Sequence, residues 1–166
     1  MVSYGYDAAD RLTLATYPDG TTDQYTYSNL DLVSRTDRQG NVWTYSYDAD
    51  RRLTAITHPL GNQTQYGYYE NGRLKSLTDA NGHTTSWNID LQSRPTAKIY
   101  ADGTQTDYAY EATTSRLKSV TDALGQSKNY QYALDDRLTG ISYQKAVNPT
   151  PNVSFAYDPY FPRVTM

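Results

Sequence analysis

Side chains that could act in catalysis or metal binding are present throughout this 166-residue chain, but they do not gather into a recognisable site. The two histidines, His58 and His83, lie in or beside glycine-containing segments, and the chain has no cysteine. A metal site needs several ligands that converge on one point, and the sequence shows no such set. Motifs typical of serine hydrolases, zinc peptidases and phosphate-binding loops do not occur either. We therefore expect no catalytic residue, no cofactor and no metal.

Aspartate and arginine recur four residues apart, as in Asp7 and Arg11 and in Asp48 and Arg52. One interpretation is a row of charges that forms a polar surface to which unfolded polypeptides do not adhere. The simpler interpretation is a set of exposed ion pairs or Asx-type turns, each worth at most about 1 kcal/mol. We favour the simpler interpretation.

Aromatic residues give the clearest pattern, because they recur in pairs two positions apart. The pairs begin at intervals of 20 to 25 residues. The paired positions are Tyr4 and Tyr6, Tyr25 and Tyr27, Tyr45 and Tyr47, Tyr66 and Tyr68, Trp87 and Ile89, Tyr108 and Tyr110, Tyr130 and Tyr132, and Phe155 and Tyr157. Because Trp87, Ile89 and Phe155 replace tyrosine, bulk and apolar contact should matter more here than a phenol hydroxyl. We expect Trp87 and Ile89 to lie in the same packed rows as the tyrosines.

Two further features share the register of the aromatic pairs. Most pairs are followed by arginine and an apolar residue, although the second repeat departs with Leu32-Val33. The leucines of this motif are Leu12, Leu53, Leu74, Leu117 and Leu138. A glycine stands five residues before each pair from the second to the seventh: Gly20, Gly40, Gly61, Gly82, Gly103 and Gly125. Three features in one register indicate eight repeats, which begin near residues 4, 25, 45, 66, 87, 108, 130 and 155.

Each repeat is expected to form two short strands and two turns. Side chains at i and i+2 of a strand point to the same face, so the aromatic pairs predict strands and not amphipathic helices. Asp19-Gly20, Asn81-Gly82 and Asp102-Gly103 are dipeptides typical of hairpin turns. A single hairpin is marginally stable in water, so the hairpins must stack on one another.

The predicted fold is therefore all-β, an array of stacked antiparallel β-hairpins that forms a twisted, curved sheet. The array should occupy residues 1–166 as one domain, with an inserted, proline-stiffened loop over residues 144–152. Stacking places residues at equivalent positions of successive repeats side by side, so the tyrosines pack in rows. Sugars could also stack on such rows, but packing explains better why the rings recur in every repeat.

Composition excludes several functional classes. The formal charge is −3, from 15 Lys and Arg against 18 Asp and Glu, and no basic patch indicates a nucleic-acid partner. No apolar run approaches the roughly 20 residues that span a bilayer. The chain opens directly into a repeat without a signal-peptide pattern, which is typical of a piece of a longer protein.

The repeat resembles the YD-repeat family, also called the RHS-repeat family. Its motif is close to Tyr-x-Tyr-Asp-x-x-Gly-Arg-Leu followed by a glycine turn, and residues 4–12, 45–53 and 66–74 match it closely. The resemblance covers residues 4–164. It implies bacterial polymorphic toxins, toxin-complex subunits or teneurins, in which such repeats form a sheet that curves into a hollow shell around a toxin or other cargo.

The leading hypothesis is accordingly a structural shell segment that encloses or scaffolds a toxin or effector, and not an enzyme. The expected partners are neighbouring repeats of the parent chain and an enclosed C-terminal toxin or effector, with edge-to-edge self-association through unpaired strands. The resemblance implies a bacterial protein that is secreted or delivered at the cell surface. The alternative is a module that binds carbohydrate or a cell-surface receptor, with glycans as partners.

Overall fold

The structure is a computed structural model that describes residues 1–158, 160 and 163–165. The chain divides into two compact units, Met1–Thr85 and Ser86–Met166. Every regular element among the described residues is a β-strand, so the predicted all-β hairpin array is confirmed. None of the described segments is a helix long and apolar enough to cross a membrane.

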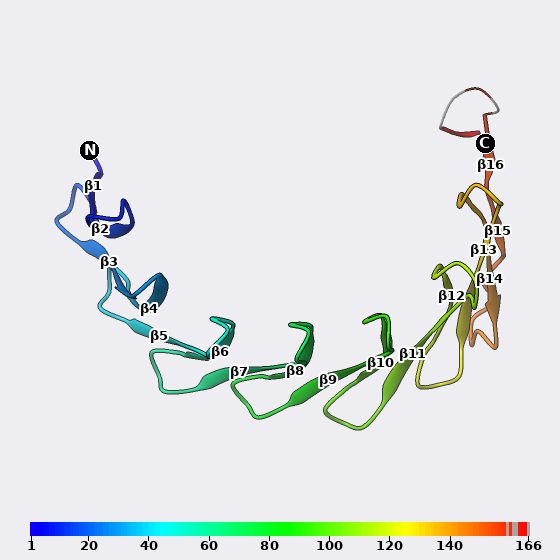
Figure 1. Cartoon of the computed structure of the whole chain (residues 1–166), viewed down its shortest axis with the longest axis horizontal. Helices are drawn as coiled ribbons and strands as arrows, with labels where there is room; N and C mark the ends of the chain where they lie inside the picture. The colour runs from blue at the N-terminus through cyan, green and yellow to red at the C-terminus, as the bar shows by residue number, and fades with distance from the viewer. Residues whose placement is uncertain (159, 161–162, 166) are drawn as a thin grey trace. The chain divides into compact units, whose positions relative to one another are not determined.

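The first unit contains strands that pair with their neighbours in chain order (Figure 1). They are β1 (Ser3–Tyr6), β2 (Leu12–Thr16), β3 (Thr22–Ser28), β4 (Asp31–Thr36), β5 (Val42–Tyr47), β6 (Leu53–Thr57), β7 (Gln63–Tyr68) and β8 (Leu74–Thr78). All the pairs are antiparallel. The odd-numbered strands carry the aromatic pairs, and the even-numbered strands carry the apolar residue of the arginine motif.

The second unit continues the same alternation. Its strands are β9 (Thr84–Ile89, which begins in the last residues of the first unit), β10 (Pro95–Ile99), β11 (Gln105–Tyr110), β12 (Leu117–Thr121), β13 (Ser127–Tyr132), β14 (Leu138–Gln144) and β15 (Val153–Ser154). A separate short pair follows, β16 (Ala156–Tyr157) with β17 (Val164–Thr165). The last aromatic pair, Phe155 and Tyr157, thus lies where the sheet gives way to this short hairpin.

Each hairpin contains a bulge at the same place, directly before the second aromatic residue. In the third repeat Tyr47 pairs with Leu53 and Ser46 pairs with Ala55, so Thr54 is the extra residue. The same shift occurs in the other six complete hairpins. The bulge explains why Leu53 and Ile56, three residues apart, both lie opposite the tyrosines of one face. Bulges also increase the twist of a sheet.

The two turns of each repeat have closely similar backbones. In the glycine turns, which end at Gly20, Gly40, Gly61, Gly82, Gly103 and Gly125, the glycine N–H donates to the carbonyl three residues earlier. These glycines have φ between 75° and 85°, the left-handed region where glycine is least strained. Such a type I turn followed by a left-handed residue is a common three-residue hairpin connection.

The other turns, here called the arginine turns, precede Arg11, Arg52, Arg73, Arg94, Arg116 and Arg137. They reach the same left-handed conformation without glycine in most repeats, at Asp10, Arg51, Ser93, Ser115 and Asp136. Only Gly72 supplies a glycine there among the described residues. The absence of glycine is why the sequence does not reveal that the two turns are alike.

The sheet has no enclosed core in the usual sense. Among the described residues only small or compact ones are buried: Ala15, Ala97 and Gly140, with Asp23 as the polar exception. The aromatic rings inside each unit are half-buried, because they pack against neighbouring rings and leucines on one face of the sheet. Stability must therefore come from contacts between repeats along that face.

The expected loop after β14 interrupts the regular turns. Residues 145–152 form an irregular connection between Gln144 and Val153, and Lys145 has a φ of 53°. The Val147 N–H donates to Gln126 Oε1 at 2.8 Å, so the loop returns over the preceding glycine turn. A shallow depression of about 260 Å³ lies beside it, lined in part by Val120, Tyr143 and Ala146.

Candidate functional site

The arginine turns are built around a carboxylate that closes the turn. Asp90 Oδ1 accepts hydrogen bonds from the backbone N–H groups of Gln92 and Arg94, both at 2.9 Å. Its Oδ2 accepts one from Arg94 Nε at 2.7 Å and pairs with Nη2 at 2.6 Å. Asp7 with Arg11 and Asp48 with Arg52 repeat this arrangement. The carboxylate fixes the turn and the direction of the arginine together.

These ion pairs are less exposed than the simpler interpretation of the sequence assumed. The side chains of Arg94 and Asp90 are 25% and 23% exposed, respectively. Hydrogen bonds from the Arg94 side chain lower the pKa of Asp90 below its ordinary value, and those from Arg11 do the same for Asp7. The pairs are also Asx-type turns, so that part of the expectation holds, but the arginine has a second set of contacts.

Five of the six turn arginines reach the next repeat and lie over its second tyrosine ring; Arg73 does not, because Ile89 stands at that position. Arg94 lies over the Tyr110 ring, with its Cζ 4.2 Å from the ring centroid. The corresponding pairs are Arg11 with Tyr27, Arg52 with Tyr68, Arg116 with Tyr132 and Arg137 with Tyr157, at 4.6 to 5.4 Å. A cation over an aromatic face contributes about 0.5–1 kcal/mol at exposed sites and more when water is excluded.

The hydroxyl of the same tyrosine binds back to the repeat that supplies the arginine. Tyr132 Oη donates to the Leu117 carbonyl at 2.9 Å, and Leu117 directly follows Arg116. Six second-position tyrosines donate to the preceding repeat in this way: Tyr27, Tyr47, Tyr68, Tyr110, Tyr132 and Tyr157, at 2.8 to 3.1 Å. For Tyr47 the acceptor is the Leu32 carbonyl, which follows Asp31 and not an arginine. The hydroxyl of the second position thus has a partner that the sequence analysis did not foresee, while the expectation that bulk matters more stays a prediction. Spacing cannot show this, because the acceptor is a backbone carbonyl.

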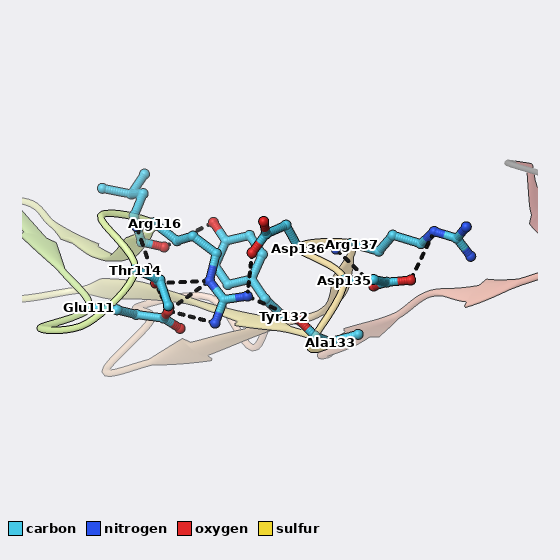
Figure 2. Close-up of polar contacts among 9 residues, drawn as sticks. Glu111, Thr114, Arg116, Tyr132, Ala133, Asp135, Asp136 and Arg137 are labelled. Atoms are coloured by element: carbon cyan, nitrogen blue, oxygen red, sulfur yellow. Dashed lines mark hydrogen bonds and ion pairs between the residues drawn. The ribbon is translucent and has the colours of Figure 1, made fainter.

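We call this set of contacts the inter-repeat clasp: a turn carboxylate, the arginine, the second tyrosine of the next repeat, and the carbonyl that accepts its hydroxyl. Figure 2 shows its most connected example, in which Arg116 lies between two turns. Its Nε donates to Glu111 and Thr114, and its Nη1 donates to the Ala133 carbonyl and Asp136, both at 2.9 Å. Burial raises the pKa of the Tyr132 phenol beneath it.

The register within each hairpin sets an apolar residue opposite most of the aromatic residues. Within each hairpin the second aromatic residue lies opposite the leucine, as Tyr47 does Leu53 and Tyr132 does Leu138. Tyr6 with Leu12, Tyr68 with Leu74 and Tyr110 with Leu117 follow the same register. First-position residues such as Tyr45, Tyr66, Tyr108 and Tyr130 lie opposite Ile56, Leu77, Val120 and Ile141. Tyr4 lies opposite Ala15, and Tyr25 lies opposite Arg35.

Trp87 and Ile89 lie on β9 in the register of an aromatic pair. Trp87 is opposite Lys98 and Ile89 is opposite Pro95, and both side chains are half-buried. Ile89 has neither a ring nor a hydroxyl, so it cannot take the tyrosine's part in a clasp. The second repeat differs in another way, because Asp31 stands where the arginine would be and pairs with Arg51 at 2.7 Å.

The two histidines have structural surroundings. His58 Nε2 lies 3.0 Å from Thr64 Oγ1, and His83 Nδ1 lies 3.2 Å from Asp79 Oδ2. No group of three or more possible metal ligands occurs among the described residues. Asp23, which the sequence analysis did not single out, is 7% exposed and accepts a hydrogen bond from Tyr17 Oη at 2.9 Å. Its position two residues before Tyr25 places it on the tyrosine face, a signal the spacing did contain.

Comparison of the sequence with known protein families identifies the repeat that the sequence pattern indicated. The RHS Repeat model matches residues 1–22, 25–63, 50–85 and 68–105, which together make up more than half of the chain. The chain belongs to the RHS-repeat family. None of the curated proteins is significantly similar to it in sequence.

Solved structures of Tc toxins share the fold of this RHS-repeat chain. The crystal structure of TcdB2-TccC3-Cdc42 matches 98% of it with a TM-score of 0.81 at 15% identity. The Photorhabdus luminescens Tc holotoxin pore matches 99% with a TM-score of 0.81 at 15% identity, and TcdB2-TccC3 matches 95% with a TM-score of 0.73 at 16% identity. The RHS-repeat chain spans about a tenth of the length of each solved chain.

Proposed function

We propose that this chain is a structural segment of an RHS-repeat β-sheet wall that encloses or scaffolds a toxin or effector polypeptide. The recurrence of the inter-repeat clasp carries the proposal. Arg94 and Tyr110, like most of their equivalents, contact each other across neighbouring repeats, and Asp90 holds Arg94 in place. A wall needs such a repeating contact, whereas a catalytic site needs a few groups converging on one point.

Several parts of this proposal rest on the family and on its solved relatives. The partners are neighbouring repeats of the parent protein and an enclosed polypeptide, and the parent is secreted or delivered at the cell surface of a bacterium. All eight repeats form a single array over residues 1–166. The chain has no catalytic activity of its own. A screen for hydrolase and nuclease activity tests the last point, and an activity abolished by one point mutation would contradict it.

Enclosure is tested by limited proteolysis of the full-length protein in which this chain occurs. We expect a polypeptide segment outside the repeats to resist protease while the wall is intact. Combining Arg52→Ala, Arg94→Ala and Arg116→Ala should open the wall and expose that segment. The matched control replaces three exposed turn leucines, Leu60, Leu91 and Leu134, with serine, which leaves every clasp in place. Equal protection in both variants, or no protected segment in the unmodified protein, would refute enclosure.

A further inference from the structure

The strand position opposite the first aromatic residue of each pair is apolar in most repeats and charged in two. In chain order it is held by Ala15, Arg35, Ile56, Leu77, Lys98, Val120 and Ile141. Arg35 also lies opposite Trp43 on the following strand. Lys98 lies opposite Trp87. The chain has no other tryptophan, so both tryptophans stand beside a cation that the stacking of repeats does not require.

Arg35 lies between two complete repeats, far from either end of the chain. It is on β4, which pairs with β3 on one side and with β5 on the other (Figure 1). Tyr25 of β3 and Trp43 of β5 are its direct partners in register, so the three side chains form one row on the tyrosine face. The Arg35 Cζ lies 5.4 Å from the centroid of the Trp43 ring. All three residues are half-buried, and their exposed parts do not result from an end of the sheet.

The Arg35 guanidinium has no acceptor in the described part of the chain. Its Nε is buried without a hydrogen-bond partner, whereas each of the five clasp arginines over a tyrosine has a carboxylate partner. The carboxylates two residues from the row are engaged elsewhere. Asp23 accepts the Tyr17 hydroxyl at 2.9 Å, and Asp37 accepts the Asn41 side-chain amide at 2.9 Å. A half-buried guanidinium without an acceptor is an unfavourable arrangement that a bound anion relieves.

The Tyr25 hydroxyl is a second donor without a partner among the described residues. The hydroxyl of Tyr27, two residues later, donates instead to the Leu12 carbonyl. Directly opposite residues of antiparallel strands have Cβ atoms about 4.5–5.5 Å apart, so the Tyr25 phenol and the Arg35 guanidinium are close enough to serve one ligand. A carboxylate accepts from both kinds of donor, and a guanidinium binds it most strongly in a bidentate arrangement.

We propose that the row of Tyr25, Arg35 and Trp43 binds an acidic sugar residue, such as a uronic acid, through its carboxylate. The carboxylate accepts from the guanidinium and from the Tyr25 hydroxyl, and the sugar ring lies against the exposed part of the indole. A carboxylate alone needs only the donors. The indole replaces the threonine of other repeats, Thr64 and Thr106, and gives the C–H groups of a sugar ring an apolar surface. This binding does not depend on enclosure of a polypeptide.

A short oligosaccharide of alternating glucuronic acid and N-acetylglucosamine is the probe. It is titrated into the 166-residue chain at physiological salt, and the indole N–H resonance of Trp43 reports binding separately from that of Trp87. We expect a dissociation constant on the order of 1 mM, because the contact is small and centres on one charged pair. A neutral N-acetylglucosamine oligosaccharide of the same length should bind at least about tenfold more weakly, since it offers the guanidinium no anion. A glutamate-containing peptide of equal charge should bind as weakly as the neutral sugar.

Two variants restore residues that other repeats carry at the same positions, so both should fold. Arg35→Ile introduces the residue found at Ile56 and should weaken binding at least about tenfold without lowering the urea midpoint. A purely structural arginine would instead lower that midpoint. Trp43→Thr introduces the residue found at Thr64 and should weaken binding several-fold. Tyr25→Phe removes a hydroxyl that has no partner in the described chain, so it should weaken binding about threefold to tenfold and leave stability unchanged.

Arg38→Gln is the matched control, because it removes the same charge from the adjoining glycine turn. Arg38 is 40% exposed and already pairs with Asp19, so binding should change by less than about twofold at physiological salt. Three results would overturn the assignment. They are absence of binding by the acidic oligosaccharide, equal weakening by Arg35→Ile and Arg38→Gln, and equal binding by the acidic peptide. The last result would assign the row to the carboxylates of a polypeptide in place of a sugar.

Discussion

The glycine turns and the arginine turns share a backbone path but are held by different means. At a glycine turn, the left-handed residue is glycine, and where the turn begins with aspartate, the carboxylate binds a side chain of its own turn, as Asp122 does Gln126 at 2.8 Å. At an arginine turn, the left-handed residue is usually not glycine, and the arginine reaches the following repeat. Backbone pairing joins strands both within a repeat and between repeats, whereas most of the side-chain contacts that reach from one repeat to the next come from the arginine turns.

One glycine turn also has an arginine that contacts another repeat, so it can be compared directly with the arginine turns. Arg38, in a glycine turn, lies over the Tyr17 ring at 4.1 Å and pairs with Asp19 of the preceding glycine turn. Its side chain is 40% exposed, against 20% for Arg116. Exposed ion pairs contribute little because water and salt screen them. We therefore expect the side chains of the glycine turns to add little to the contacts between repeats even where an arginine is present.

The largest effect should come from removing a central clasp arginine. Arg116→Ala deletes charged hydrogen bonds to Glu111, Asp136 and the Ala133 carbonyl and uncovers the Tyr132 ring. We expect a loss of about 2–3 kcal/mol in the free energy of unfolding, since hydrogen bonds to charged groups contribute about 1.5–3 kcal/mol. Urea unfolding followed by circular dichroism measures it. Arg38→Ala is the comparison, with an expected loss below about 1 kcal/mol; equal losses would remove the distinction between the turns.

The next largest loss of stability should come from replacing a glycine of a glycine turn, because any other residue is strained in its backbone conformation. Gly103 has a φ of 81°, and an added Cβ would meet no atom within 4 Å. Gly103→Ala should therefore cost about 1–2 kcal/mol from conformation alone. At the arginine turns the same conformation is already held by a larger residue, Ser93 at φ 64°. Ser93→Gly should change stability by less than about 1 kcal/mol. A neutral Gly103→Ala variant would contradict the conformational argument.

The sequence predicted the strands, the hairpins and the register because each depends on local spacing. The aromatic pairs give the strand period, and dipeptides such as Asp102-Gly103 mark the turns. The inter-repeat clasp was missed because its acceptor, the Leu117 carbonyl, is a backbone atom fifteen residues from Tyr132. The bulge at Thr54 was present in the sequence as the three-residue spacing of Leu53 and Ile56, which a regular strand cannot place on one face.

A smaller effect should separate the two positions of an aromatic pair. Tyr132→Phe removes only the hydroxyl that donates to the Leu117 carbonyl and should cost about 0.5–1.5 kcal/mol. Tyr130, two residues earlier on β13, has no hydrogen bond to its hydroxyl among the described residues. Tyr130→Phe should therefore cost less than about 0.5 kcal/mol. Thermal and urea unfolding of the two variants compare the positions directly, and the reverse order would show that the hydroxyl of the second position does not hold repeats together.

The smallest effect expected is that of mild acid. Hydrogen bonds from Arg11, Arg52 and Arg94 help to lower the pKa of Asp7, Asp48 and Asp90 in the folded chain. A carboxylate whose folded pKa lies below its unfolded value of about 3.9 contributes stability that is complete above that value and is lost as the pH falls through the folded pKa.

The unfolding midpoint should consequently stay almost constant from about pH 8 to pH 5 and decline only below about pH 4. Urea unfolding across this range tests the expectation. Asp90→Asn, which cannot ionise, should flatten part of the acid decline while lowering stability at neutral pH. A decline that is already steep between pH 7 and pH 5 would mean that groups outside the arginine turns control the response to acid. The role assigned to the arginine turns would then have to be revised, because the clasp carboxylates would not be the residues that limit stability in acid.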